Sequence, residues 1–295
     1  MLNFHTNEDH DEILGILKYK PNYRYKKYPK TYLSLTSSPE RLKNVGLMLS
    51  LLDLSHISEI HINLPVYYRN DPKFSYKEDD IHFLKKLDSR IKIFRPKKDL
   101  GPVTKILPTL MRVKTGLVIS VDDDIAYPFD IISQLMNAAV KNPKEITCGG
   151  GFTFGGKGMG EYGEYFRGTK WKNLWPANCA KYPFVDILEG YSSVAYNKSL
   201  MNMDVIDLIL HLNKFCKLSD DLTISYSLRI RGVKIKSLKR GEDIYPFSYG
   251  QQADALHKGG GEGGEDANFI KYKKCLMELM NRSPDKITKR RSKKL

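Results

Sequence analysis

The sequence has few cysteines and no long apolar run, and these absences exclude several classes of protein. Its four cysteines (Cys148, Cys179, Cys216 and Cys275) are scattered without the paired spacing of a zinc site, so we expect small core residues or incidental thiols. No apolar stretch is long enough to span a bilayer. The N-terminal segment, MLNFHTNEDHDEILGILKYK, has acidic residues where a signal peptide would have a basic start and an apolar stretch. We therefore expect a protein of a reducing, cytoplasmic compartment, at most peripheral at a membrane.

Acidic residues are also scarce relative to basic ones, 34 against 48, which gives a formal net charge of +14. The last ten residues, KITKRRSKKL, are basic and contain no acidic side chain. Such a segment either binds nucleic acid, anionic lipid or an acidic partner, or is a solvated terminus. We expect residues 1–30 to be an N-terminal extension and 283–295 to be a disordered basic tail.

The first half of the chain alternates between patterns typical of strands and of helices. Strands are predicted at 31–36, 59–65, 91–96 and 116–121, and helices at 38–54, 78–88, 101–113 and 128–142. Ser38 is the expected N-cap of the first helix, with Pro39 at its first position, and Pro108 is expected to interrupt the third helix. This alternation predicts an α/β fold, a mostly parallel central sheet flanked by helices, in a single domain over 31–282.

The second half is less regular. Residues 148–175 are rich in glycine and aromatic residues, which indicates loops with a β excursion. Strands are predicted at 191–198 and 233–238, and a final helix at 265–280. Between them, 218–232 is predicted to be a helix capped by Ser219 or Asp220 and ended by Gly232.

Three consecutive aspartates, Asp122, Asp123 and Asp124, directly follow the apolar run Leu117–Val121. In parallel sheets ligands bind at the carboxyl ends of the strands, and hard divalent cations prefer carboxylate oxygens. If the strand geometry continues, Asp122 and Asp124 point to one side and Asp123 to the other. The sequence thus predicts a metal site at this sheet edge, although an acidic turn or a helix cap is the simpler interpretation.

Other polar groups are further candidates for a site, and Lys105 is expected near the same strand ends. Lys105 follows a Gly-Pro turn, and Glu189 and Gly190 precede a strand, where a glycine allows a ligand close to the backbone. Asp220 and Asp221 begin a helix, as a cap or as a general base. His257 and Lys258 precede a glycine run of the kind that wraps phosphates.

In order and spacing, these segments resemble the GT-A fold glycosyltransferases over roughly 31–258, in particular inverting, family-2-like members. VISVDDDIAYP is similar to their Asp-x-Asp motif, and SLTSSPERL to the first strand and turn, where the nucleotide lies. DLGPVTKI resembles a donor-pocket segment, SDDLTISYSLRIRG the acidic pair before a helix, and DALHKGG a late segment whose histidine binds the metal.

The resemblance implies roles for individual residues. Asp221 would be the catalytic base, with Asp220 as the alternative. Mn²⁺ or Mg²⁺ would be held by Asp124, Asp122 and His257. The donor, a UDP- or GDP-linked sugar, would be bound by Thr36, Ser37, Arg41, Asp99, Lys105, Asp122, Asp123, Glu189, Gly190 and Lys258. The implied reaction transfers the sugar with inversion to an acceptor hydroxyl, expected to belong to a glycan or glycoconjugate.

Two other functions compete with this hypothesis. A sugar nucleotidyltransferase would need a glycine-rich phosphate loop directly after the first strand, but the turn here is TSSPERL. A non-catalytic protein that binds nucleic acid or an anionic surface would use the net charge, and the segment KYKPNYRYKKYPK partly fits that pattern. This last function leaves the three aspartates and the acidic pair unexplained.

Overall fold

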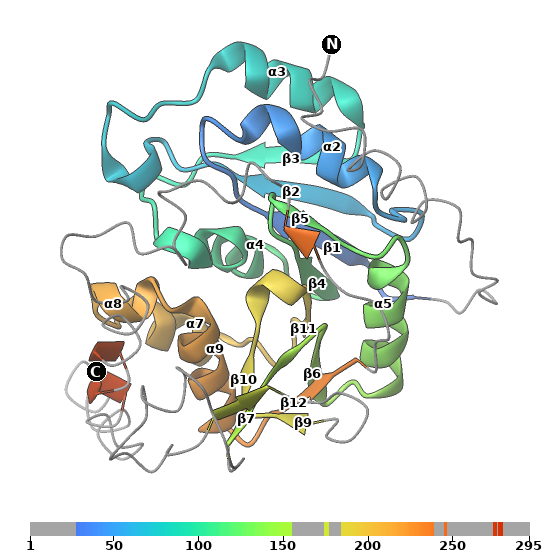
Figure 1. Ribbon diagram of the computed structural model, residues 1–295, viewed down its shortest axis with the longest axis vertical. Helices are drawn as coiled ribbons and strands as arrows, with labels where there is room; N and C mark the ends of the chain where they lie inside the picture. Colours follow the sequence, from blue (N-terminus) through green and yellow to red (C-terminus); the bar gives the residue numbers. More distant parts are fainter. Residues whose placement is uncertain are drawn as a thin grey trace.

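The computed structural model describes residues 28–154, 174–176, 184–238, 245–246, 274–275 and 277–279. Its centre is an eight-stranded sheet in the order β3-β2-β1-β4-β11-β6-β12-β9 (Figure 1). The strands are β1 (Thr31–Leu35), β2 (Glu59–Asn63), β3 (Ile91–Phe94), β4 (Leu117–Ser120), β6 (Glu145–Cys148), β9 (Phe184–Val185), β11 (Val194–Asn197) and β12 (Lys234–Ser237). The four strands predicted in the first half are therefore present, whereas β6 was not predicted from the sequence.

The sheet is mixed but mostly parallel, as the alternating pattern predicts. β3, β2, β1 and β4 run parallel to one another, and β6 runs parallel to β12. β11 is antiparallel to both β4 and β6, and β9 is antiparallel to β12. Because β1 and β4 are parallel neighbours, the segments that follow them, which begin at Thr36 and Val121, leave the sheet at the same edge.

Two small sheets accompany the large one. β7 (Gly151–Phe154) pairs with β8 (Leu174–Pro176) and with β10 (Ile187–Leu188). β5 (Ile125–Ala126) pairs with β13 (Tyr245–Pro246). The β excursion expected within 148–175 is therefore confirmed for the strands at its two ends.

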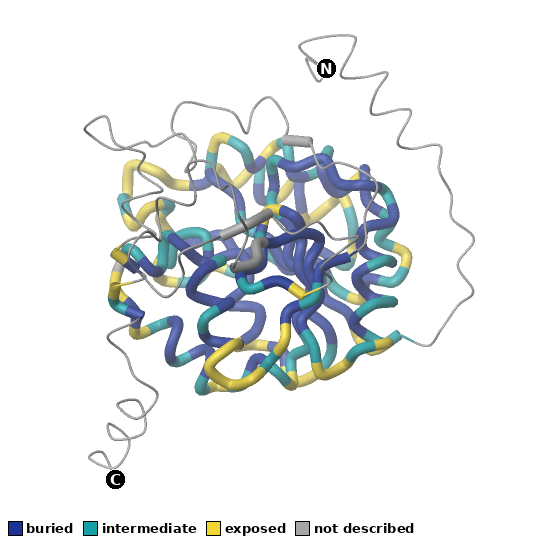
Figure 2. Tube along the Cα trace, turned by 60° about the horizontal axis from the view of Figure 1, so that its bottom comes forward, coloured by how far each residue is buried: buried dark blue, intermediate teal, exposed yellow. Residues whose placement is uncertain are grey.

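Helices pack on both faces of the sheet and form two hydrophobic cores. One core joins the sheet to η1 (Leu42–Asn44), α2 (Val45–Ser50), α3 (Glu78–Leu87) and α5 (Ile131–Lys141), and contains the strand residues Leu33 and Ile119. The other joins it to η3 (Gly101–Lys105), α4 (Leu107–Arg112), α7 (Met203–Leu210) and α9 (Asp220–Arg229), and contains Tyr32 and Val118. Successive strand residues thus face opposite cores, and Figure 2 shows the buried trace through the middle of the molecule. The short helices η2 (Tyr68–Asn70), η4 (Gly190–Ser192) and α8 (Lys214–Lys217) lie in connections.

The helix predicted over 38–54 is shorter than expected. Residues 39–41 form a turn in which the Arg41 N–H donates to the Ser38 carbonyl at 3.2 Å, and helical structure begins only at Leu42. The expectation that Ser38 caps this helix is therefore wrong. The turn instead brings Arg41 towards the aspartates that follow β4, as described below.

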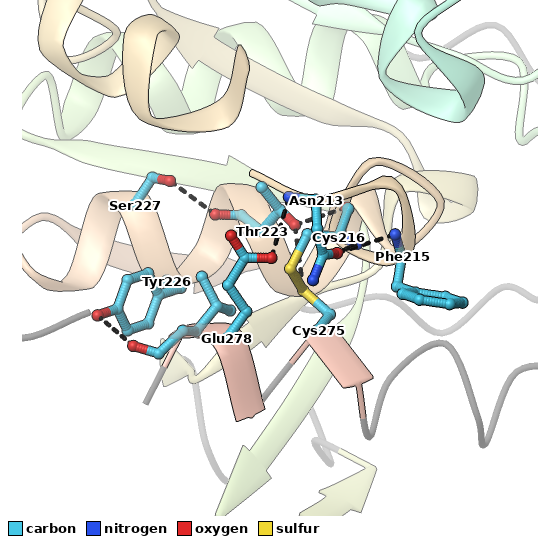
Figure 3. The surroundings of a disulfide bond; sticks show 9 residues. Asn213, Phe215, Cys216, Thr223, Tyr226, Ser227, Cys275 and Glu278 are labelled. Carbon is cyan, nitrogen blue, oxygen red and sulfur yellow. Dashed lines mark hydrogen bonds between the residues drawn. A yellow bond between two sulfur atoms is a disulfide. The ribbon is translucent and has the colours of Figure 1, made fainter. Parts of the chain in front are cut away.

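Two cysteines correct the expectation of incidental thiols. Cys216 and Cys275 are buried, as core cysteines should be, but they form a disulfide between residues 59 positions apart (Figure 3). The bond ties α8 to the described part of the C-terminal helix, residues 274–275 and 277–279. The Tyr226 hydroxyl donates to the Leu279 carbonyl at 3.0 Å, and this bond attaches the same segment to α9 as well. Disulfides are rare in reducing compartments, so this pair weighs against the predicted cytoplasmic location.

Loss of this disulfide is expected to destabilise the protein by about 2–4 kcal/mol, because the cross-link restricts a long loop of the unfolded chain. We expect the double variant Cys216→Ala/Cys275→Ala to shift the urea unfolding midpoint downwards, and reductant to shift the wild type alike. Cys148→Ala, at a buried cysteine outside the disulfide, is the control. It keeps the 216–275 bond, so reductant should shift its midpoint as it shifts that of the wild type, whereas reductant should leave the midpoint of the double variant unchanged. Peptide mapping of the oxidised protein should recover the 216–275 cross-link, and its absence would contradict the pairing.

No helix among the described residues is both long and apolar enough to cross a membrane. The predicted N-terminal extension up to residue 27 and the predicted basic tail lie outside the described residues. The same holds for most of the helix predicted over 265–280 and for the glycine-rich segment 254–266, which contains His257 and Lys258.

Candidate active site

The three aspartates lie in the turn between β4 and β5, at the sheet edge where the sequence places them. β4 ends at Ser120, and Asp123 and Asp124 form a turn. The strand alternation therefore does not continue. Asp122 pairs with Lys105, whereas Asp123 and Asp124 share Arg41. The expectation that Asp122 and Asp124 point together to one side, with Asp123 opposite, is not what the pairing shows.

Arg41 holds two of the three carboxylates. Its Nη2 lies 2.9 Å from Asp123 Oδ1, its Nε donates to Asp123 Oδ2 at 3.1 Å, and its Nη1 lies 3.0 Å from Asp124 Oδ2. Ser37 Oγ donates to Asp123 Oδ2 at 2.5 Å, and the Tyr76 hydroxyl fixes this turn by donating to the Ser37 carbonyl at 2.8 Å. The predicted residues Ser37 and Arg41 therefore meet the aspartates directly.

The clustering of acidic groups changes their titration. Burial and the neighbouring carboxylates of Asp122 and Asp123 raise the pKa of Asp124 to about 7, against the opposing effect of Arg41. Burial also raises the pKa of Asp123, although Arg41 and Ser37 lower it. Burial disfavours the charged form of a carboxyl group, so this turn holds more negative charge than its surroundings fully compensate.

Lys105 connects the aspartate turn to the start of α9. Its Nζ lies 2.9 Å from Asp122 Oδ1 and 3.4 Å from Asp220 Oδ2. Burial alone would lower the pKa of this ammonium, but Asp122, Asp220 and Asp221 together raise it well above its usual value. Lys105 is therefore a buried cation in an acidic environment.

Asp221, the second residue of the acidic pair, is oriented by the turn before β11. The Gly190 N–H donates to Asp221 Oδ1 at 2.9 Å. Loss of hydration and the adjacent Asp220 carboxylate raise the pKa of Asp221 well above its usual value, while Lys105 and the Gly190 N–H oppose this shift. Asp220 is buried at 8% exposure, whereas Asp221 retains partial exposure to solvent. The structure therefore brings the predicted residues Lys105, Gly190, Asp220 and Asp221 together.

The remaining predicted residues occupy different positions. Thr36 Oγ1 donates to the Asn63 carbonyl at the end of β2 at 2.7 Å. Asp99 accepts the N–H groups of Arg69 at 2.7 Å and Gly101 at 2.8 Å, so its carboxylate stabilises the start of η3. The Glu189 carbonyl accepts from Ser192 Oγ at 2.6 Å. His257 and Lys258 lie outside the described residues.

Two tyrosines support the site without having been predicted from the sequence. The Asp122 N–H donates to the Tyr127 hydroxyl at 2.8 Å, and Tyr127 is 2% exposed. Tyr127 lies five residues after Asp122 in the DDDIAYP segment, so its nearness in the sequence could have indicated a contact with the aspartate turn. Tyr76 lies between β2 and α3, in a connection that gives no sequence signal for its contact with Ser37.

The described residues fit a divalent cation that is held by one or two carboxylates together with a ligand, and not one enclosed by protein groups alone. They contain no group of three or more histidine, cysteine or acidic side chains arranged around a common metal position. Five carboxylates nevertheless lie near two cations: Arg41 pairs with Asp123 and Asp124, Lys105 pairs with Asp122 and Asp220, and Asp221 helps to raise the pKa of Lys105. Mg²⁺-like ions are commonly held by one or two carboxylates, with phosphate and water completing the shell. The donor set therefore suits a cation bound together with a phosphorylated ligand.

The mixed, mostly parallel sheet flanked by helices, with an acidic turn at its carboxyl edge, is a GT-A-like fold. The chain is similar to the crystal structure of GalNAc-T7 with UDP, GalNAc and Mn²⁺, at a TM-score of 0.52 and 12% identity. The match covers 88% of this chain and 50% of that one, so this chain spans about half the length of the protein it resembles. At this identity the likeness shows the fold alone. No protein-family model and no curated protein matches the sequence.

Proposed function

We propose that this protein is a metal-dependent glycosyltransferase that moves a sugar from a UDP- or GDP-linked donor to an acceptor hydroxyl, expected on a glycan, with inversion. The observation that carries the proposal is the pair of acidic groups joined by Lys105. Asp122–Asp124 lie at the sheet edge, and Asp220–Asp221 lie at the start of α9. One group suits the donor and its cation, and the other suits an acceptor. The similarity in fold to a structure that contains UDP, GalNAc and Mn²⁺ supports the nucleotide-sugar and cation parts of this proposal, whereas inversion rests on the Asp220–Asp221 pair.

On the donor side, Asp122, Asp124 and His257 would hold Mn²⁺ or Mg²⁺. When bound, the cation supplies charge neutralisation to the departing diphosphate. Arg41 and Ser37 hold Asp123 and Asp124 in place. Preorganised groups of this kind cost no rearrangement when the ligand arrives. Thr36, Asp99, Glu189, Gly190 and Lys258 remain predicted donor-binding residues.

On the acceptor side, Asp221 is the base that the geometry favours. Asp220 is more deeply buried and paired with Lys105, whereas Asp221 is partly exposed and oriented by the Gly190 N–H. A raised pKa brings a carboxylate closer to the value that suits a general base at neutral pH. Asp221 would accept the proton of the acceptor hydroxyl as its oxygen attacks the anomeric carbon from the face opposite the diphosphate, which inverts that carbon.

Calorimetric titration of UDP and of GDP, with Mn²⁺ and again with EDTA, tests the donor half of this proposal. We expect one nucleotide to bind in the presence of Mn²⁺ and to bind at least about tenfold more weakly to Asp124→Asn, a loss of about 1.4 kcal/mol. Asp53→Asn is the matched control, because the Asp53 carboxylate accepts the Ser55 N–H in a turn, a contact that an asparagine oxygen also makes.

Equal binding with Mn²⁺ and EDTA, or no binding of either nucleotide, would contradict the proposal. Salt-sensitive binding of nucleic acid without metal would then favour the anionic-surface function. The sugar nucleotidyltransferase hypothesis has no supporting contact among the described residues, since the turn after β1 is occupied in holding Asp123 through Ser37 and Arg41.

A further inference from the structure

Lys105 has an unusual position for a lysine that merely contacts a ligand. It is 6% exposed, and its ammonium lies between a carboxylate after β4 and a carboxylate of α9. The two carboxylates come from different parts of the fold, because β4 belongs to the central sheet and α9 packs on one face of that sheet. The side chain therefore links the two acidic groups of the site.

The backbone of Lys105 is fixed by a break in the local helix. η3 ends at Lys105 and α4 begins at Leu107, with Ile106 in a non-helical conformation between them. The Lys105 carbonyl is bonded from the sheet instead, by Ser34 Oγ at 2.5 Å and by Asn63 Nδ2 at 3.3 Å. Because buried carbonyl groups need partners, these polar side chains of β1 and β2 hold the lysine at this point.

Gly190 leaves the space that the ammonium occupies. A Cβ at this position would lie 2.7 Å from both Lys105 Nζ and Asp221 Oδ1. Real side chains essentially never approach so closely, so any larger residue would displace one of the two groups. The same glycine donates its N–H to Asp221 Oδ1, so it both makes room for Lys105 and orients the proposed base.

The turn that carries Gly190 is itself tied to β4. Ser193 has a positive φ of 70°, which is uncommon for a residue other than glycine. Its hydroxyl donates to the carbonyl of Ser120, the last residue of β4, at 2.8 Å, and its carbonyl accepts the Gly149 N–H at 2.8 Å. Strained residues persist where the surroundings over-determine them, and here those bonds fix the Gly190 turn against the strand that leads to Asp122.

We propose that Lys105 and Gly190 act together as a joint that sets the position of the base Asp221 relative to the donor-binding end of β4. In this joint Lys105 is a positioning residue, because its ammonium pairs with Asp122 and Asp220. Gly190 has no Cβ and therefore leaves space for the ammonium and the Asp221 carboxylate to lie side by side. The inference rests on the proposed function for its consequence in catalysis, but the joint itself is measurable without any substrate.

Residue-resolved amide hydrogen exchange on the full chain tests the joint directly. We expect Lys105→Met and Gly190→Ala each to accelerate exchange of the residue 190 amide by about ten- to a hundredfold, as loss of a hydrogen bond to a charged group implies. The Asp122 amide, which donates to Tyr127, should change less than about threefold, because the strand end stays folded. The double variant should exchange no faster than the faster single variant, since both act on one contact.

Two matched variants serve as controls. Lys198→Met removes a partly buried lysine whose Nζ donates to the Met201 carbonyl at 3.0 Å, away from the site. Gly46→Ala likewise places a Cβ 2.7 Å from the end of a side chain, but that side chain is Leu87, an exposed residue of α3. Neither should alter the residue 190 amide.

The outcomes separate this inference from the proposed function. Unchanged exchange at residue 190, or equal acceleration at residue 190 and Asp122, would overturn the joint, because Lys105 would then be irrelevant to Asp221 or generally structural. Local acceleration would support it even if neither UDP nor GDP binds the wild type. Failure of nucleotide binding would instead count against the glycosyltransferase proposal alone.

Discussion

Replacing Arg41 by methionine is expected to lower the free energy of unfolding by about 3–5 kcal/mol near pH 8. The guanidinium contacts Asp123 and Asp124 at 2.9 to 3.1 Å, and Asp123 is only 3% exposed. Methionine fills much of the same volume but leaves both carboxylates without their cation. Removing one partner of a buried ion pair lowers the free energy of unfolding far more than removing a partner of an exposed pair, because the remaining buried charge stays desolvated. Urea unfolding followed by circular dichroism measures the loss.

The loss should depend on pH in a defined direction. With Arg41 present, the pKa of Asp124 is already about 7 in the folded state, and removal of the cation raises the pKa values of Asp123 and Asp124 further. The folded variant then binds protons that the unfolded chain, with ordinary carboxyl pKa values near 4, does not bind. Stability of the variant therefore rises as the pH falls from about 8 towards about 5, and its deficit relative to the wild type shrinks.

Arg231→Met is the control for this experiment. Arg231 Nη1 lies 3.2 Å from Asp204 Oδ2, but the two side chains are 36% and 42% exposed. Exposed ion pairs contribute at most about 1 kcal/mol, so this variant should stay close to the wild type at every pH. A similarly small loss in Arg41→Met, or a deficit independent of pH, would show that Arg41 does not compensate the buried aspartates.

The sequence was most informative where a local pattern determines the structure. Buried β-branched runs and helical periodicity gave β1–β4, α3, α5 and α9 at positions close to those observed. The alternation of strands and helices predicted a mostly parallel sheet, and in the structure β1 and β4 are parallel neighbours, which brings the segment with Ser37 and Arg41 beside the aspartates. The candidate residues Lys105, Gly190, Asp220 and Asp221, which the family resemblance named together, lie close to one another in the structure.

The sequence was least informative about which side chains pair. Three consecutive aspartates gave no indication that the strand ends at Ser120 and that Asp123, not Asp122, shares Arg41 with Asp124. Local patterns did not show that the segment after Ser38 forms a turn, because its apolar spacing continues through residues 42–54. The Cys216–Cys275 disulfide joins residues 59 positions apart, and such pairings depend on the tertiary fold, which spacing alone does not determine.

One property of the site, its concentration of carboxylates, accounts for several otherwise unrelated residues. The aspartate turn, the helix break after Lys105, Gly190 and the start of α9 have little in common as sequence patterns. In the structure they all serve to hold five carboxylates and two cations at one edge of the sheet. Asp123 and Asp220 are buried and the other three carboxylates are half-buried, and desolvated negative charge of this kind is costly for a fold. Its concentration beside a partly exposed aspartate argues for chemistry at this edge and against a protein that merely presents a basic surface.

Replacing Asp221 by asparagine is expected to slow glycosyl transfer by about 10²- to 10⁴-fold, the usual contribution of a general base. Asparagine has nearly the same size, and its carbonyl oxygen accepts the Gly190 N–H as Asp221 Oδ1 does at 2.9 Å. The fold and Mn²⁺-dependent nucleotide binding should therefore remain, with the dissociation constant within about threefold of the wild type. Release of UDP or GDP from the donor that calorimetry identifies, in the presence of a panel of glycan acceptors, measures the rate.

The pH dependence and the neighbouring residue make this prediction specific. The pKa of Asp221 is raised well above its usual value, and only the ionised carboxylate accepts a proton. The wild-type rate should therefore rise with pH until Asp221 is fully ionised, and the residual rate of Asp221→Asn should lack this rise. Asp220→Asn is the matched control, since it removes the charge 3.4 Å from Lys105 but leaves Asp221 in place. A larger loss in Asp220→Asn than in Asp221→Asn would assign the base to Asp220, and near-normal transfer by Asp221→Asn would exclude Asp221 from proton abstraction.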